Sequence, residues 1–190
     1  MPRGGTFLQR WRVPLGFLSA AVVLVAARPA FWTLIIGGAI AAVGLLIRAW
    51  ASGHIRKNAV LAISGPYSYT RNPLYFGSFL LGLGFTIAAS YEWFSLIFGA
   101  VFSAFYLSVY LPVMRAEIGE LQRIFGADYE RYERAVPLFL PRLTAFRLSN
   151  DANNSPEKFD LSLYMRYREY RAAIGLCAAI VFLVLKRTFL

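Results

Sequence analysis

The stretch Gly65-Pro-Tyr-Ser-Tyr-Thr-Arg-Asn-Pro-Leu-Tyr75 lies between two apolar segments and constrains the fold more than any other part of the chain. Pro66 and Pro73 fix their own φ angles and bias the residues before them away from the helical region. Polar backbone at membrane depth is tolerated only where protein or a water-filled cavity covers it. The stretch therefore predicts an irregular loop that presents its arginine and tyrosines at a membrane surface, as a ligand site requires.

The composition is that of an integral membrane protein. Of the 190 residues, 58% are hydrophobic and 16% are charged, whereas soluble domains average roughly 25% charged residues. The length suits one helical domain. Cys177 is the single cysteine, so a disulfide framework within the chain is excluded. His54 is the single histidine and has no companions at the spacing of a metal site, so no metal site is predicted.

Five apolar segments predict an all-α integral membrane fold, which is a helical bundle of about five transmembrane segments with a cytoplasmic helical C-terminal part. The segments are Val13–Ala27, Ala30–Ile47, Leu74–Ala89, Trp93–Met114 and Ala172–Leu185. The last has 14 residues, which reach only about 21 Å. It is therefore interpreted as a tilted partial span, an interfacial helix or a packing arm for a second copy.

The basic residues predict how the chain is oriented. If the N-terminus is cytoplasmic and all five segments cross, only Arg28, Lys186 and Arg187 face outward, which leaves 17 of the 20 Lys and Arg inside. This is the positive-inside pattern. The net charge of +10 is then a topology signal and an attraction to anionic headgroups, and nucleic-acid binding is not expected. The predicted partner is the lipid bilayer.

The chain divides into a membrane domain over residues 1–142, a polar linker over 143–155 and a C-terminal helix over 156–190. Ser155-Pro156-Glu157 has the composition of a helix start. Gly37, Gly38 and Gly44 predict close helix–helix packing.

Three further features concern the region around the quoted loop. Gly77 and Gly84 share one helix face, which predicts a narrow groove for either a ligand or a neighbouring helix. Gly126 is predicted to end or break the charged helix that begins at Arg115. Two prolines predict an extended strap over Val136–Arg142.

Two motifs flank one predicted helical hairpin. The first is Gly65-Pro-Tyr-x-Tyr-x-Arg-Asn-Pro-Leu-Tyr75-x-Gly77, and the second is Glu117-x3-Leu121-x3-Phe125-Gly126-x2-Tyr129-x2-Tyr132-x3-Val136-Pro137. In order and spacing the pair resembles the isoprenylcysteine carboxyl methyltransferase family and the related membrane phospholipid methyltransferases. The resemblance covers about residues 52–142.

This resemblance implies S-adenosyl-L-methionine bound on the cytoplasmic side and methyl transfer to a membrane lipid or prenylated acceptor, chiefly the carboxylate of an isoprenylcysteine-like substrate. Arg115 lies two residues from the position of the family's substrate arginine. Asn72 replaces the family's histidine, and Ile118 replaces its second glutamate. Carried over by position, the cofactor contacts fall on Ala59, Val60, Leu61, Ala62, Tyr67, Asn72, Pro73, Leu74, Tyr75 and Glu117.

The residue types agree with that chemistry. Glu117 suits the amino or ribose groups of the cofactor, the aromatic rings of Tyr67 and Tyr75 suit its adenine, and Arg71 is predicted to organise the loop and bind one anionic group. Methyl transfer depends on alignment and desolvation, so it needs no catalytic triad. Glu117 pairing only with a neighbouring arginine, and tyrosines acting only as interface anchors, are the structural alternatives.

Other functions also fit parts of the pattern. A phospholipid N-methyltransferase would use the same cofactor on an amine. A sterol-type reductase would hold NADPH in its inner loops, and a non-catalytic membrane scaffold would need neither cofactor. The methyl acceptor and the oligomeric state are not specified by the sequence.

Overall fold

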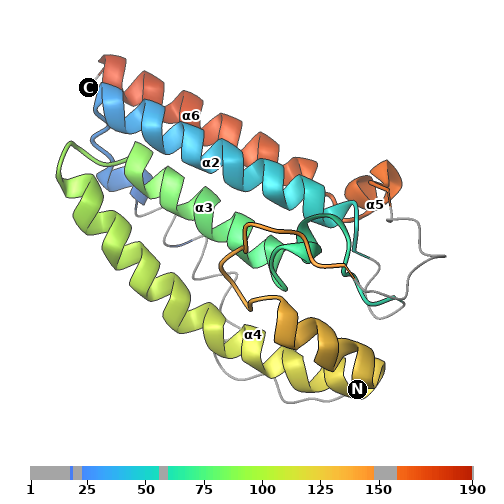
Figure 1. Ribbon diagram of the computed structural model, residues 1–190. Coiled ribbons are helices and arrows are strands. Elements are labelled where there is room, and N and C mark those ends of the chain that lie inside the picture. The colour runs from blue at the N-terminus through green and yellow to red at the C-terminus, as the bar shows by residue number, and fades with distance from the viewer. Residues whose placement is uncertain (1–17, 19–22, 56–59, 148–157, 190) are drawn as a thin grey trace.

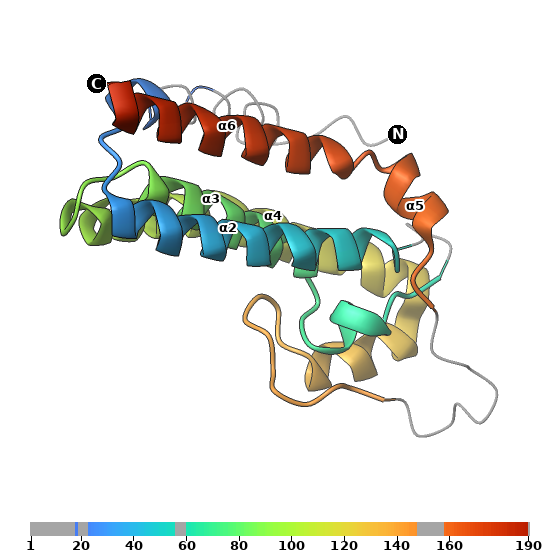
Figure 2. The same cartoon turned by 90° about the horizontal axis from the view of Figure 1, so that it is seen from above.

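The computed structural model describes residues 18, 23–55, 60–147 and 158–189, and these contain helices and loops but no strand. The helices are α2 (Phe31–Ser52), the short 3₁₀ helix η1 (Gly65–Ser68), α3 (Pro73–Ala88), α4 (Phe94–Ala135), α5 (Leu161–Arg166) and α6 (Tyr170–Phe189). In Figure 1, α2, α3 and α4 lie side by side with α6 along α2. Figure 2 shows α2, α3 and α4 as one layer and α6 beside it. The predicted all-α membrane fold is confirmed.

The part of the chain that the structure describes holds fewer helices able to span a membrane than the five predicted segments. Three described helices, α2, α4 and α6, are long and apolar enough to cross a membrane, whereas α3 has 16 residues. A helix of that length reaches about 24 Å, short of a hydrocarbon core of about 30 Å. The predicted span Val13–Ala27 is described only at Leu18 and 23–27, so most of it lies outside the described residues.

Glycines bring α2 and α3 into backbone contact. A Cβ atom added at Gly44 would lie 2.5 Å from the amide nitrogen of Leu81 and 2.6 Å from the carbonyl oxygen of Gly77. Gly37 and Gly84 make the equivalent close approach further along the pair. The predicted helix–helix role of Gly37 and Gly44 is thus confirmed. The groove at Gly77 and Gly84 holds a neighbouring helix.

Helix α4 continues from its apolar part into its charged part without a break at Arg115. The predicted break occurs at Gly126, whose φ of 53° is in the left-handed region. The end of α4 then folds back beside its own preceding turns (Figure 1). Val136 caps the helix in an extended conformation, and the strap that follows lodges Phe139 against Phe76 and Phe79, each at 5.6 Å between ring centroids.

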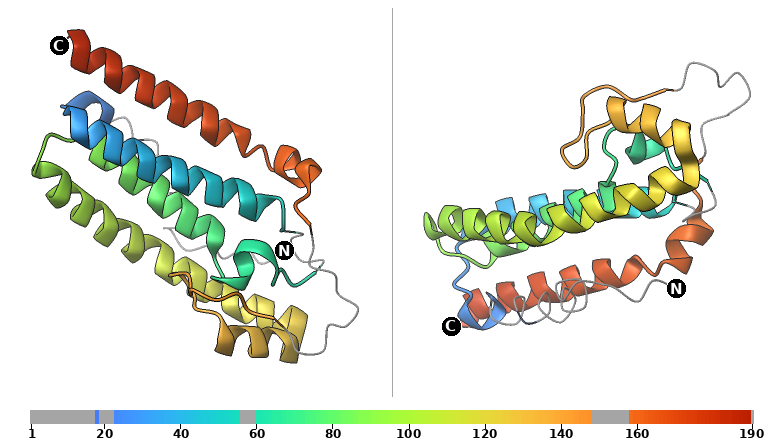
Figure 3. Two further views of the ribbon diagram at one scale, coloured as in Figure 1. Left: turned by 45° about the horizontal axis from the view of Figure 1, so that its top comes forward. Right: turned by 90° about the horizontal axis from the view of Figure 1, so that it is seen from below.

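The C-terminal region differs from the single helix that was predicted. Residues 158–160 are not helical, and α5 starts after Asp160. The Asp160 carboxylate caps the helix by accepting a hydrogen bond from the Ser162 amide at 2.8 Å. Arg168, with φ of 57°, separates α5 from α6, and Figure 3 shows the resulting bend. The predicted start Ser155-Pro156-Glu157 and most of the linker lie outside the described residues.

Helix α6 is longer than the 14-residue segment that predicted it. Its 20 residues reach about 30 Å, because flanking polar residues extend it at both ends. Leu183 is fully buried beside Ala27 and Ala88. Lys186 Nζ donates to the carbonyl oxygen of Val25 at 2.7 Å. These contacts hold the C-terminal end of α6 against the residues that precede α2 and against the C-terminal end of α3.

Candidate functional site

A cavity of about 620 Å³ lies where the loop after α2, the start of α3 and the charged part of α4 meet. Ten of the twelve predicted site residues line it, and they come from two separate parts of the chain, residues 60–75 and Glu117 in α4. These are Val60, Leu61, Ala62, Tyr67, Arg71, Asn72, Pro73, Leu74, Tyr75 and Glu117. Ala59 lies outside the described residues, and Arg115 is exposed and is not among the lining residues.

The loop takes its shape from η1 and from the strap. Gly65 begins η1 at φ of 56°, which favours glycine. The Arg71 amide donates to the carbonyl oxygen of Pro137 at 2.9 Å, and the Arg142 amide donates to that of Tyr69 at 2.9 Å. Backbone groups that would otherwise be unpaired in a buried loop are thus satisfied by a segment almost 70 residues away.

Side chains of the loop strengthen the same attachment. Thr70 Oγ1 donates to the carbonyl oxygen of Phe139 at 2.9 Å, and Asn72 Nδ2 donates to that of Leu138 at 3.0 Å. The amide of Asn72 therefore positions the strap, while the residue also lines the cavity.

Tyr67 carries the most informative polar atom of the cavity. The residue is 6% exposed, and its hydroxyl has no hydrogen-bond partner among the described residues. Burial raises the pKa of Tyr67, and Tyr167 and Glu169 raise it further, so the hydroxyl stays neutral and able to donate. Buried polar groups are nearly always paired, and a bound ligand would supply the missing partner.

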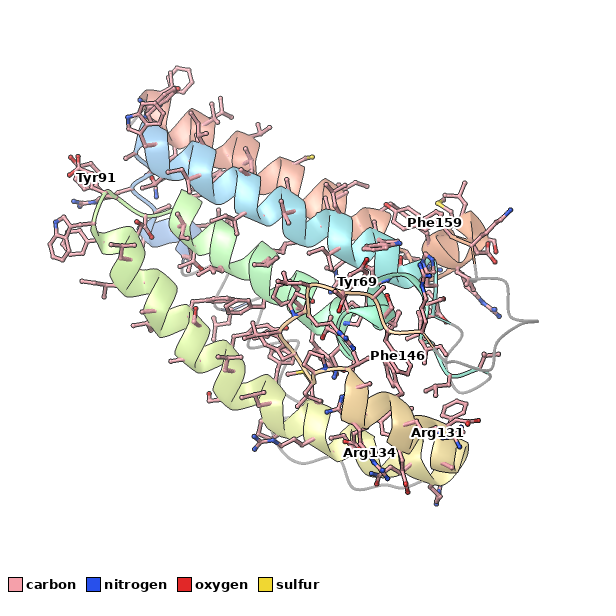
Figure 4. All side chains as sticks on the ribbon, in the orientation of Figure 1. Tyr69, Tyr91, Arg131, Arg134, Phe146 and Phe159 are labelled. Carbon is pink, nitrogen blue, oxygen red and sulfur yellow. The ribbon has the colours of Figure 1, made fainter. Side chains whose placement is uncertain are left out.

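Arg71 belongs to an ion pair that the sequence analysis missed. Its Nη1 donates to Glu133 Oε1 at 2.6 Å and to the hydroxyl of Tyr129 at 3.3 Å. Its Nε is buried and unpaired within the described residues. Glu133 also accepts a bond from Gln122 at 2.9 Å. The guanidinium thus ties the loop to the folded-back end of α4, from which Arg131 and Arg134 project (Figure 4).

Glu117 and two tyrosines form an acidic, aromatic part of the wall. The Tyr75 hydroxyl donates to Glu117 Oε1 at 3.0 Å, and the rings of Tyr75 and Tyr110 are 5.6 Å apart between centroids. Within the described residues the partner of Glu117 is thus a tyrosine and not an arginine. A carboxylate beside aromatic faces suits an organic cation.

Arg48 and Glu169 also line the cavity, and the sequence analysis did not identify them as site residues. Two nitrogens of Arg48 donate to Glu169, Nε at 3.0 Å and Nη2 at 2.8 Å, and Nη1 donates to Ser78 Oγ. The pair joins residues 121 positions apart, so no local pattern could have revealed it. Within the described residues, no group of three or more His, Cys, Asp or Glu is arranged to hold a metal ion.

Two curated proteins are similar to the chain. The cobalt-zinc-cadmium resistance protein CzcN of Cupriavidus metallidurans is 36% identical over 149 residues, which are 72% of this chain and 64% of CzcN. The nickel-cobalt-cadmium resistance protein NccN of Alcaligenes xylosoxydans xylosoxydans is 33% identical over 156 residues, which are 75% of this chain and 70% of NccN. The chain belongs to the CzcN/NccN family. No family model and no solved structure matched it significantly.

Membership of the CzcN/NccN family corrects the predicted function. Both relatives are named for resistance to metals, so the prediction of an S-adenosylmethionine-dependent methyltransferase is wrong. Without methyl transfer, the lipid or prenylated acceptor that was expected for it is no longer required. The two motifs specify a loop and a cavity, and one such scaffold supports different activities. The match spans less than two thirds of the length of CzcN.

Proposed function

We propose that this member of the CzcN/NccN family is a membrane protein that contributes to resistance against cobalt, zinc, cadmium or nickel cations, and that it acts by binding a ligand in the cavity. The similarity to two resistance proteins over 72% and 75% of the chain carries the first part. The unpaired hydroxyl of Tyr67 in a cavity wall supports the second.

The chemistry of the wall favours an amphipathic organic cation as ligand. Glu117 offers a carboxylate, which is worth about 1.5–3 kcal/mol as a hydrogen-bond partner of a charged group. Tyr75 and Tyr110 offer ring faces, each worth about 0.5–2 kcal/mol to a cation. Tyr67 offers a buried donor.

S-adenosyl-L-methionine, the ligand expected from the loop motif, fits this set of groups. Its sulfonium suits the carboxylate and the ring faces, and its adenine suits the aromatic walls. Calorimetric titration of the detergent-solubilised protein with S-adenosyl-L-methionine tests this ligand, and S-adenosylhomocysteine, which lacks the sulfonium charge, is titrated beside it. Absence of binding of both compounds would remove the ligand. The proposed role is binding and not methyl transfer.

The proposed orientation has the N-terminus and the cavity on the cytoplasmic side, because basic residues concentrate at the cavity end of the helices. In a Cys177→Ser background, Leu143→Cys should react with an impermeant thiol reagent only from the cytoplasm, since Leu143 is 99% exposed. Glu92→Cys, in the turn before α4, should react only from outside. Reaction of both positions from one side would contradict this orientation.

A growth assay tests the resistance role and the site together. Cells that express the wild-type chain should tolerate more cobalt, zinc, cadmium or nickel than cells with an empty vector. Glu117→Gln should remove most of that gain, because loss of a charged hydrogen-bond partner weakens ligand binding by about 10-fold or more. Glu130→Gln is the control, since the Glu130 side chain is 55% exposed and lies outside the cavity.

Two results would contradict these expectations. No change in tolerance to any of the four cations on expression of the wild-type chain would overturn the resistance role. Full tolerance with Glu117→Gln would retain that role and remove Glu117 from the site. Immunoblots of the membrane fraction must show equal amounts of each variant.

A further inference from the structure

The Arg48–Glu169 ion pair lies in the wall of the cavity. Arg48 comes from the cavity end of α2, and Glu169 comes from the turn between α5 and α6. Their side chains are 23% and 13% exposed, and both residues face the cavity. The pair thus presents one cationic and one anionic group side by side in the same wall.

Each member retains hydrogen-bonding capacity. A guanidinium has five N–H donors, and a carboxylate has about four acceptor sites. Nε and Nη2 of Arg48 engage Glu169, and Nη1 engages Ser78. That leaves at least one N–H on Nη1 for an incoming carboxylate and acceptor capacity on Glu169 for an incoming ammonium.

The turn that carries Glu169 has other attachments to α2 and the segment after it. The Asp160 amide donates to the carbonyl oxygen of Gly53 at 2.9 Å, and the Tyr167 hydroxyl donates to that of Ile55 at 3.3 Å. The ring of Phe159 lies against Gly53. Arg168, directly before Glu169, is held at φ of 57°, and such strained backbone is concentrated at functional sites.

Tyr67 lines the same cavity as Arg48 and Glu169. Its hydroxyl is buried and has no protein partner among the described residues. Burial raises the pKa of Tyr67, and Tyr167 and Glu169 raise it further, so this third polar group of the wall stays neutral and able to donate.

We propose that Arg48, Glu169 and Tyr67 form a subsite that binds the zwitterionic amino-acid group of the cavity ligand. This rests on the proposed binding of a nucleoside-type organic cation. The ammonium group lies against Glu169, the carboxylate lies against Arg48, and the Tyr67 hydroxyl donates to the carboxylate. Glu117 and its tyrosines are then left for the remainder of the ligand.

The test compares two ligands that differ in this group. S-adenosylhomocysteine carries the amino-acid group, and 5′-methylthioadenosine has the same nucleoside thioether without it. Calorimetric titration of the full-length protein in detergent should give at least about 10-fold tighter binding of S-adenosylhomocysteine. Glu169→Gln and Arg48→Gln should reduce this preference to less than about 3-fold, and the surface control Glu130→Gln should leave it intact.

The possible results separate this subsite from the proposed function. Equal affinity of both compounds for the wild-type protein, or an undiminished preference in Glu169→Gln, overturns the subsite and leaves the nucleoside ligand in place. No binding of either compound overturns the subsite, and no binding of S-adenosyl-L-methionine as well overturns the proposed ligand, while the growth assay still decides the resistance role. If the charge variants do not fold, Tyr67→Phe decides, because it removes only the hydroxyl and should lower the preference about 3-fold or more.

Discussion

Gly37→Val should strongly destabilise the folded protein, whereas Gly38→Val, one position along the same helix, should be tolerated. A Cβ atom at Gly37 would meet the main chain of Gly84 and Ala88 in α3, and neither backbone can move without separating the two helices. The nearest atom to a Cβ at Gly38 is the flexible end of Ile180, at 3.9 Å. Overpacking costs about 1–3 kcal/mol where side chains can adjust, so about 3 kcal/mol or more is expected at Gly37.

The two variants are matched in helix position and in the residue introduced, so the difference between them reports packing alone. Thermal unfolding in detergent should show a melting temperature at least about 6 °C lower for Gly37→Val than for Gly38→Val. Equal melting temperatures would show that α2 and α3 are not in backbone contact.

Arg71→Met should produce the second large effect, a loss of about 2–4 kcal/mol of stability. Removal of one partner from a buried ion pair leaves the other charge uncompensated, at a cost of about 3–5 kcal/mol. The Glu133 side chain is 24% exposed, which lowers this expectation. The loop would also lose its connection to Tyr129 at the end of α4.

A double-mutant cycle isolates the ion pair. Glu133→Gln in the Arg71→Met background should recover part of the stability, since it removes the charge left behind. Arg134→Met is the matched control, because its pair with Glu130 has side chains that are 78% and 55% exposed, and such pairs contribute about 0–1 kcal/mol. If Arg71→Met and Arg134→Met unfold at the same temperature, Arg71 does not organise the loop.

The parts of the fold that were predicted from the sequence depend on local chemistry. Pro73 begins α3 within one residue of the predicted segment, because proline suits the first helical turn and excludes helix before it. Gly126 breaks α4 because glycine adopts positive φ without steric cost. Gly37 and Gly44 make the close contacts expected of small residues in a membrane.

The parts that were missed depend on long-range contacts or on competition between local signals. Nothing near Arg48 in the sequence points to Glu169, and nothing near Arg71 points to Glu133. At the C-terminus, Asp160 caps α5, and the described residues before it are not helical. Residues of the loop motif line a cavity, but the activity inferred from the motif was wrong, since residues that shape a loop and a cavity do not specify a reaction.

The pairing of the loop with the strap has a consequence for the order in which the protein assembles. Thr70 and Phe139 are 69 positions apart in the sequence. Closure of a long flexible segment is entropically costly, so the part of the chain between these two residues should fold before their hydrogen bond forms. The hairpin of α3 and α4 shortens that separation in space. The attachment of the loop to the strap is therefore expected to form last among the contacts up to the strap, as a high-contact-order step. A chain that stalls after α4 would insert its helices, and the loop that lines the cavity would still lack its attachment.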